Sequence, residues 1–148
     1  MSEWLFAEDV GHYWQTSKSS PDIWIDRAKA EIEAVGGSVL REGFGRDTGG
    51  RAAFMLEFQL DGELFAILWQ VLPSSTGNER AAKVQAATAL YHDVKARCIS
   101  SLWIGRRAAF FSYLELPDGR TTSQLATPEL ALSLPRFLLS SGKDIEQH

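Results

Sequence analysis

Hydrophobic and polar residues alternate through residues 51–72, in two runs separated by Asp61-Gly62. An Asp-Gly pair is typical of a two-residue type I′ turn, because both central positions of that turn need a positive φ. The turn fixes the register of an antiparallel hairpin and gathers large apolar side chains on one face. The expected cross-strand pairs are Leu60–Glu63, Phe58–Phe65, Leu56–Ile67 and Phe54–Trp69.

The apolar spacing changes to three and four after Pro73, which is typical of an amphipathic helix. Asn78 is the expected N-cap, and Glu79 lies in the first turn, where the helix dipole favours a negative charge. Small residues in the first half of this helix favour close packing on the aromatic face of the hairpin. The apolar stripe of the helix is Val84, Ala87, Tyr91, Val94, Cys98 and Leu102.

Shorter elements are expected before the hairpin. Residues 1–19 are rich in aromatic side chains and predict a short strand or helical turn docked on the core. Ser20-Pro21 is a good helix start, and Gly36-Gly37 permits the left-handed conformation that ends a helix. A strand is expected at residues 38–44, with Leu40 and Phe44 on one side and Gly43 and Gly45 weakening the strand or marking a bulge.

After the long helix, residues 108–116 predict a strand and Pro117-Asp118-Gly119 a turn. Residues 120–124 are the candidate return strand, and Thr127-Pro128 and Pro135 indicate two short helices at residues 128–134 and 135–140. The fold class expected is α+β: an antiparallel sheet of three or more strands packed against a long helix, with an N-terminal helix and short C-terminal helices. Residues 1–148 form a single domain, with a docked segment at 1–19 and a flexible tail at 141–148.

Composition narrows the class of protein. The chain has 148 residues, of which 45% are hydrophobic, so one globular domain with a real core is expected. Cys98 is the single cysteine, which argues against a disulfide framework and fits a small core residue in a reducing compartment. No signal peptide and no long apolar run is present, so a soluble, cytoplasmic protein with no membrane role is expected.

No catalytic motif stands out, and the sequence favours a non-enzymatic protein without cofactors. His12, His92 and Cys98 lack the spacing of a metal site. The order helix, three strands, helix also matches many metal-dependent nucleases, in which Glu57 would be one acid. The next strand offers Trp69-Gln70-Val71, without the second acid and lysine, so a degenerate nuclease-like fold is one alternative.

The charge along the chain is uneven. Residues 77–107 carry six basic and two acidic side chains, a net charge of +4, which leaves −8 for the rest of a chain of net charge −4. A basic segment of this kind suits contact with phosphates. Candidate stacking residues for bases are Trp24, Trp69 and Trp103. The candidate phosphate contacts are Arg80, Lys83, Arg97, Arg106 and Arg107.

The hairpin AFMLEFQLDGELF and the helix NERAAKVQAATALYHDVKA resemble the strand–strand–strand–helix core of single-strand annealing recombinases, the phage recombinases and their eukaryotic relatives. The likeness covers about a third of the chain. It implies an ATP-independent protein that binds single-stranded DNA along a basic groove and assembles into rings or filaments. The matching helix residues are Glu79, Arg80, Ala81, Lys83, Ala86, Ala87 and Leu90.

Besides the degenerate nuclease-like alternative, two classes of function follow. The first is a non-enzymatic, phage-type nucleic-acid-binding protein that binds or anneals single-stranded DNA during recombination. The second is a small interaction or regulatory protein with no nucleic-acid role. Five tryptophans and eight phenylalanines are many for a chain of this size, so a homo-oligomer is expected in either case.

Overall fold

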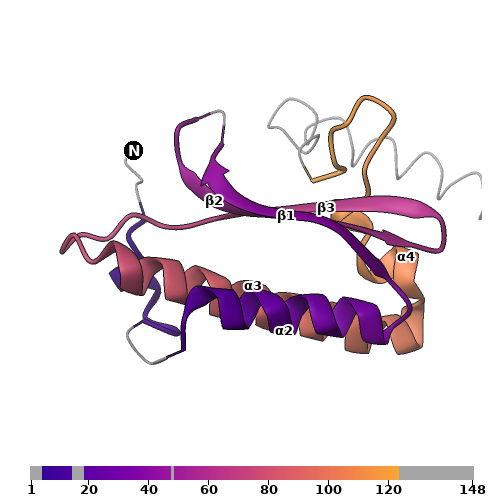
Figure 1. The fold of residues 1–148 in the computed structure, drawn as a ribbon, viewed down its shortest axis with the longest axis horizontal. Coiled ribbons are helices and arrows are strands. Elements are labelled where there is room, and N and C mark those ends of the chain that lie inside the picture. The colour runs from indigo at the N-terminus through magenta and orange to yellow at the C-terminus, as the bar shows by residue number, and fades with distance from the viewer. Residues whose placement is uncertain (1–4, 15–18, 48, 124–148) are drawn as a thin grey trace, which may run out of the picture.

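The computed structural model describes residues 5–14, 19–47 and 49–123. Its strands form an antiparallel sheet in the order β1-β2-β3. Helices α2 and α3 lie side by side against one face of this sheet (Figure 1). The α+β fold with a three-stranded antiparallel sheet packed against a long helix is therefore confirmed. The elements are α1 (Ala7–Val10), α2 (Pro21–Ala34), β1 (Ser38–Arg46), β2 (Ala52–Leu60), β3 (Glu63–Gln70), α3 (Glu79–Ile104), α4 (Arg106–Ala109) and the 3-10 helix η1 (Phe111–Tyr113).

The hairpin of β2 and β3 has the predicted turn and register. Asp61 and Gly62 adopt φ values of 52° and 81°, both positive as a type I′ turn requires. All of the expected cross-strand pairs are present. Phe58 and Phe65 are fully buried and stack with their ring centroids 5.6 Å apart. The turn therefore directs the aromatic face of the hairpin into the core.

Strand β1 carries a β-bulge at Leu40, between Val39 and Arg41, so the alternative that Gly43 and Gly45 mark a bulge is wrong. Val39 pairs with Phe58 and Phe44 pairs with Phe54, so both side chains lie on the core side of the sheet. Val39 and Phe44 are five residues apart, and in a regular strand an odd separation places two side chains on opposite faces. The extra residue of the bulge shifts the alternation by one, so both side chains lie on the same face. Leu40 itself is 48% exposed.

Helix α2 begins and ends as expected. Ser20 is its N-cap and Pro21 its first residue. Gly36 follows the helix with φ of 94°, which favours glycine. At Gly37 an added Cβ would lie 2.6 Å from Ile32 and 2.8 Å from Leu60, so the chain turns tightly against the core there. The buried face of α2 consists of Ile25, Ala28 and Ile32.

Helix α3 also begins as predicted, because the Asn78 side chain accepts a hydrogen bond from the Ala81 amide at 3.1 Å. The stripe that starts at Val84 is buried as far as Cys98, apart from a half-buried Tyr91. Burial raises the pKa of the Cys98 thiol to about 11, which fits an inert core cysteine.

The end of α3 leaves the core, and the prediction that Leu102 continues the buried stripe is wrong. Leu102 is 77% exposed and Trp103 79% exposed. The helix has 26 residues and so spans about 39 Å, whereas the eight residues of β3 span about 27 Å. The helix is longer than the sheet beneath it, so its last turn has no strand to pack on.

The predicted strand at residues 108–116 is also wrong. After Gly105 the chain forms the short helices α4 and η1, and Phe110 packs its fully buried ring edge-on to Phe58 at 5.4 Å. Only isolated bridges remain in the described part of this segment, from Phe65 to Leu114 and from Glu115 to Thr121. The chain between residues 114 and 123 crosses to the sheet face opposite the helices (Figure 1).

The turn at Pro117-Asp118-Gly119 is confirmed by a hydrogen bond from the Gly119 amide to the Leu116 carbonyl at 2.8 Å. The predicted return strand at residues 120–124 is reduced, over its described residues, to the bridge at Thr121. The expected helices at 128–134 and 135–140 and the tail at 141–148 lie outside the described residues. No helix in the described ranges is both long and apolar enough to cross a membrane.

Candidate ligand pocket

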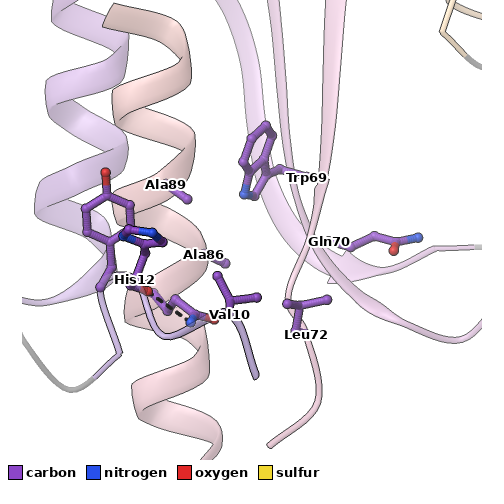
Figure 2. Close-up of a pocket in the computed structure, with 9 residues that line it drawn as sticks. Val10, His12, Trp69, Gln70, Leu72, Ala86 and Ala89 are labelled. Atoms are coloured by element: carbon purple, nitrogen blue, oxygen red, sulfur yellow. Dashed lines mark hydrogen bonds between the residues drawn. The ribbon is translucent and has the colours of Figure 1, made fainter. Parts of the chain in front are cut away.

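A pocket of about 510 Å³ opens between the N-terminal segment, the end of β3 and the first half of α3 (Figure 2). Its volume and mainly apolar lining are typical of sites that hold small organic ligands. Its walls come from segments that are far apart in the sequence, so the pocket exists only when the chain is folded. The lining residues are Val10, His12, Tyr13, Trp69, Gln70, Leu72, Gln85, Ala86 and Ala89.

The N-terminal segment is held at the pocket by polar contacts around Glu8. The Glu8 carboxylate accepts hydrogen bonds from the Ser74 hydroxyl at 2.7 Å, the Ser75 amide at 3.0 Å and the Thr76 hydroxyl at 2.9 Å. Desolvation opposes ionisation, but these hydrogen bonds outweigh it and lower the pKa of Glu8 to about 2. The Ala7 amide also donates to the Pro73 carbonyl at 2.9 Å. Within the described part of residues 1–19, α1 (Ala7–Val10) is therefore a helical turn that contacts the loop after β3.

Gln85 connects the same segment to α3. Its side-chain nitrogen donates to the carbonyl oxygens of Ala7 at 2.8 Å and His12 at 3.0 Å. Gln85 is only 4% exposed, and these bonds satisfy both of its donors. The N-terminal backbone is thereby fixed as one wall of the pocket.

Aromatic rings form much of the rest of the lining. Tyr13 stacks on His92 of α3, with centroids 5.0 Å apart and an angle of 9° between the rings. Tyr13 has a φ of 61°, an unusual backbone conformation for a residue other than glycine. Strained backbone conformations of this kind are often found at ligand-binding sites. Trp69 is half-buried and faces the pocket from β3 (Figure 2). The expectation that Trp69 is buried under α3 is therefore only partly correct.

The helical wall is made of small side chains. Ala86 and Ala89 lie three residues apart, on one face of α3, and point toward the space beside Trp69 (Figure 2). The sequence contained this signal, because small residues in the first half of the helix stand opposite an aromatic strand. The sequence pattern predicts close packing of these small residues on the hairpin, but the structure has an open pocket at this end of α3.

The polar side chains of the pocket are few. His12, Tyr13, Gln70 and Gln85 are in its lining, and no lysine, arginine, carboxylate, serine or cysteine is among the described lining residues. The described part of the chain also holds no group of three or more His, Cys, Asp or Glu side chains that would bind a metal. Glu57, the acid of the nuclease-like alternative, lies outside the pocket and pairs with Arg41 at 2.9 Å, which lowers the pKa of Glu57.

The structure pairs two of the candidate phosphate contacts with the hairpin. Arg106 donates to both carboxylate oxygens of Asp61, at 3.0 and 2.7 Å. Arg107 lies 3.1 Å from Glu63. Both carboxylates come from outside residues 77–107, so they offset the local positive charge that the sequence indicated.

A third candidate, Arg97, also has a structural role. Its guanidinium donates to Asp93 at 2.9 Å and to the Ala109 carbonyl at 3.0 Å, and it covers the Tyr113 ring at 4.5 Å. These contacts hold α4 and η1 against α3. Arg97 therefore stabilises the turn that replaces the predicted strand.

Arg80 and Lys83 lie near the start of α3, at the opposite end from Arg106. Arg80 is exposed, and the Lys83 ammonium lies 3.9 Å from the centroid of the Phe44 ring. Phe44 is itself 47% exposed. The five candidates thus fall at three places: Arg80 and Lys83 near the start of α3, Arg97 in its second half, and Arg106 and Arg107 beyond its end, in α4.

The other candidate stacking residues also lie apart. Trp24 packs against Tyr91 at 5.4 Å and beneath Arg27 at 4.6 Å, whereas Trp103 is exposed at the far end of α3. Sequence reasoning named Trp69 for base stacking or core packing and missed the other residues that line the pocket. Comparison of the chain with protein-family models, curated proteins and solved structures finds no match.

Proposed function

We propose that this protein is a non-enzymatic binding module whose pocket holds an apolar, planar group of a ligand. The observation that carries the proposal is the pocket of about 510 Å³ bounded by Trp69, Ala86 and Ala89. Pockets of this size with an apolar lining and a few polar groups are where proteins generally bind small ligands. The proposal belongs to the interaction or regulatory class and requires no nucleic acid.

The position of the N-terminal segment supports the proposal. Glu8 and Gln85 hold this segment against the loop after β3 and against α3, through the hydrogen bonds described above. A segment held in this way closes one side of the pocket without filling it. A ligand would bury the exposed part of Trp69 and displace water from an apolar surface, which is favourable.

The test is an NMR titration of the ¹⁵N-labelled full chain with benzothiophene, an apolar two-ring probe. We expect shift changes at the amides of Trp69, Ala86 and Ala89 and at the Trp69 indole. Ala89→Leu places a larger side chain in the pocket and should abolish them. Ala96→Leu, the same change at an exposed position of the same helix, is the matched control and should leave them intact. Shifts confined to other surfaces would disprove the proposal.

Single-stranded DNA binding is the second candidate function, and one surface favours it. Arg80, Lys83 and the exposed Phe44 combine positive charge with an aromatic face, as surfaces that bind single strands do. Arg46 also belongs to this end of the molecule, in the last position of β1. The interaction would be salt-dependent, because each neutralised phosphate releases a counterion.

Fluorescence anisotropy with a labelled single-stranded oligonucleotide at low salt tests this candidate. We expect Arg80→Glu to weaken binding equally for all sequences. Lys95→Glu is the matched control, since it makes the same charge change on an exposed position of α3, about 22 Å along the helix. An equal loss in both variants would indicate a general charge effect, and no binding by the folded protein would exclude the candidate.

A further inference from the structure

One polar group in the pocket has an orientation that its surroundings fix. The Gln85 side chain is 4% exposed, and its nitrogen donates to the carbonyl oxygens of Ala7 and His12. Both partners are acceptors, so the amide nitrogen must face them and the amide cannot be reversed. Its oxygen, Oε1, has no hydrogen-bond partner among the described residues, on a side chain that lines the pocket.

An unpaired acceptor in an apolar pocket discriminates between ligands. A ligand without a donor removes water from Gln85 Oε1 and leaves it unsatisfied, which is unfavourable. A ligand with a suitably placed N–H or O–H group replaces that water by a direct hydrogen bond. The discrimination is strong at such sites because the cost falls only on the ligand that lacks the donor.

The remaining walls indicate the shape and charge of the ligand. Trp69 faces the methyl groups of Ala86 and Ala89 across the pocket (Figure 2), and this arrangement suits a flat ring that packs against an aromatic side chain. No lysine, arginine, aspartate or glutamate is among the described lining residues. An ionised ligand would therefore lose its hydration without gaining an ion pair with any of these side chains.

We infer that the pocket binds a neutral aromatic small molecule whose ring carries an N–H or O–H group, and that Gln85 Oε1 accepts the hydrogen bond from this group. The inference rests on the proposed function of the pocket and deepens it by naming the class of ligand. Gln85 then has two roles, since its nitrogen holds the N-terminal wall while its oxygen selects the ligand.

The test compares indole with benzothiophene, which has nearly the same shape but carries sulfur in place of the ring N–H. NMR titration of the full chain should give a dissociation constant about tenfold lower for indole, the usual effect of one hydrogen bond to an acceptor that the ligand itself covers. Ala89→Leu should abolish the binding of both probes, and Ala96→Leu should change neither.

Each outcome separates the inference from the proposed function. Equal affinity for the two probes, lost in Ala89→Leu, would overturn selection by Gln85 and leave the pocket as a ligand site. Binding of neither probe to the wild-type chain would overturn the proposed function and the inference together.

Discussion

Replacing Phe58 with alanine should remove the central contact between the sheet and the elements that cover it. Phe58 is fully buried, stacks on Phe65 at 5.6 Å and meets the edge of Phe110 at 5.4 Å. Burial of a phenylalanine contributes about 1.5–3 kcal/mol, and each aromatic pair adds about 0.5–1.5 kcal/mol. With the cavity that remains, Phe58→Ala should lower the free energy of unfolding by about 3–5 kcal/mol.

Urea denaturation followed by circular dichroism measures this loss by linear extrapolation. Phe58→Leu keeps part of the volume and should cost less, so it provides a graded comparison if the alanine variant unfolds. Phe111→Ala is the matched control, because Phe111 is 52% exposed, and should cost about 1 kcal/mol or less. A loss below about 1 kcal/mol for Phe58→Ala would refute the packing of this core.

Further predictions concern the turn, the N-terminal wall and assembly. Gly62→Val should lower the free energy of unfolding by about 1–3 kcal/mol through backbone strain at φ of 81°. A steric clash does not contribute, because nothing lies within 4 Å of an added Cβ. Unchanged thermal stability would refute the turn assignment. The pKa of Glu8 is depressed in the folded state, so its stabilisation is present above pH 4.5 and is lost as the pH falls toward about 2. Glu8→Gln should lack this part of the pH dependence of the urea midpoint, and an unchanged dependence would contradict the Glu8 contacts. Self-association through the exposed Leu102 and Trp103 should give a mass above 16.4 kDa by light scattering and be abolished by Leu102→Glu; a wild-type monomer at all concentrations would exclude it.

The sequence predicted those parts of the fold that local chemistry determines. The Asp61-Gly62 pair strongly favours a type I′ turn, and this turn determines the register of the whole hairpin. Asn78 and Pro21 likewise mark helix starts through contacts with their own neighbours. Such features require no knowledge of distant residues, which is why they were predicted correctly.

The errors occurred where distant residues decide the conformation. Residues 106–110 form a helical turn because Arg97 binds the Ala109 carbonyl and Arg106 binds Asp61, and neither contact is visible in the local pattern. Leu102 continues the regular apolar spacing of α3, but α3 extends beyond the end of the sheet, so Leu102 has no strand to pack on. The position of the bulge in β1 depends on matching Val39 and Phe44 to positions on β2.

The pocket could not be predicted for a related reason. Its lining combines the N-terminal segment, the end of β3 and α3, and only the fold brings these together. Gln85 occupies a buried position of an amphipathic helix, and the sequence does not show that its donors are used by Ala7 and His12. The basic residues are evident in the sequence, but Arg106 and Arg107 pair with carboxylates of the hairpin, Asp61 and Glu63. The net charge of residues 77–107 therefore overestimates how many basic side chains are free to contact phosphates.

The most direct test of the ligand site is to detect contacts between a bound ring and α3. Isotope-filtered NMR on the ¹³C-labelled chain with unlabelled indole reports protons within about 5 Å of each other, close to contact distance. The account predicts nuclear Overhauser effects from indole to the methyl groups of Ala86 and Ala89, and none to the exposed Ala30 and Ala96. Contacts to Ala30 or Ala96, or their absence at Ala86 and Ala89 in the saturated complex, would contradict it.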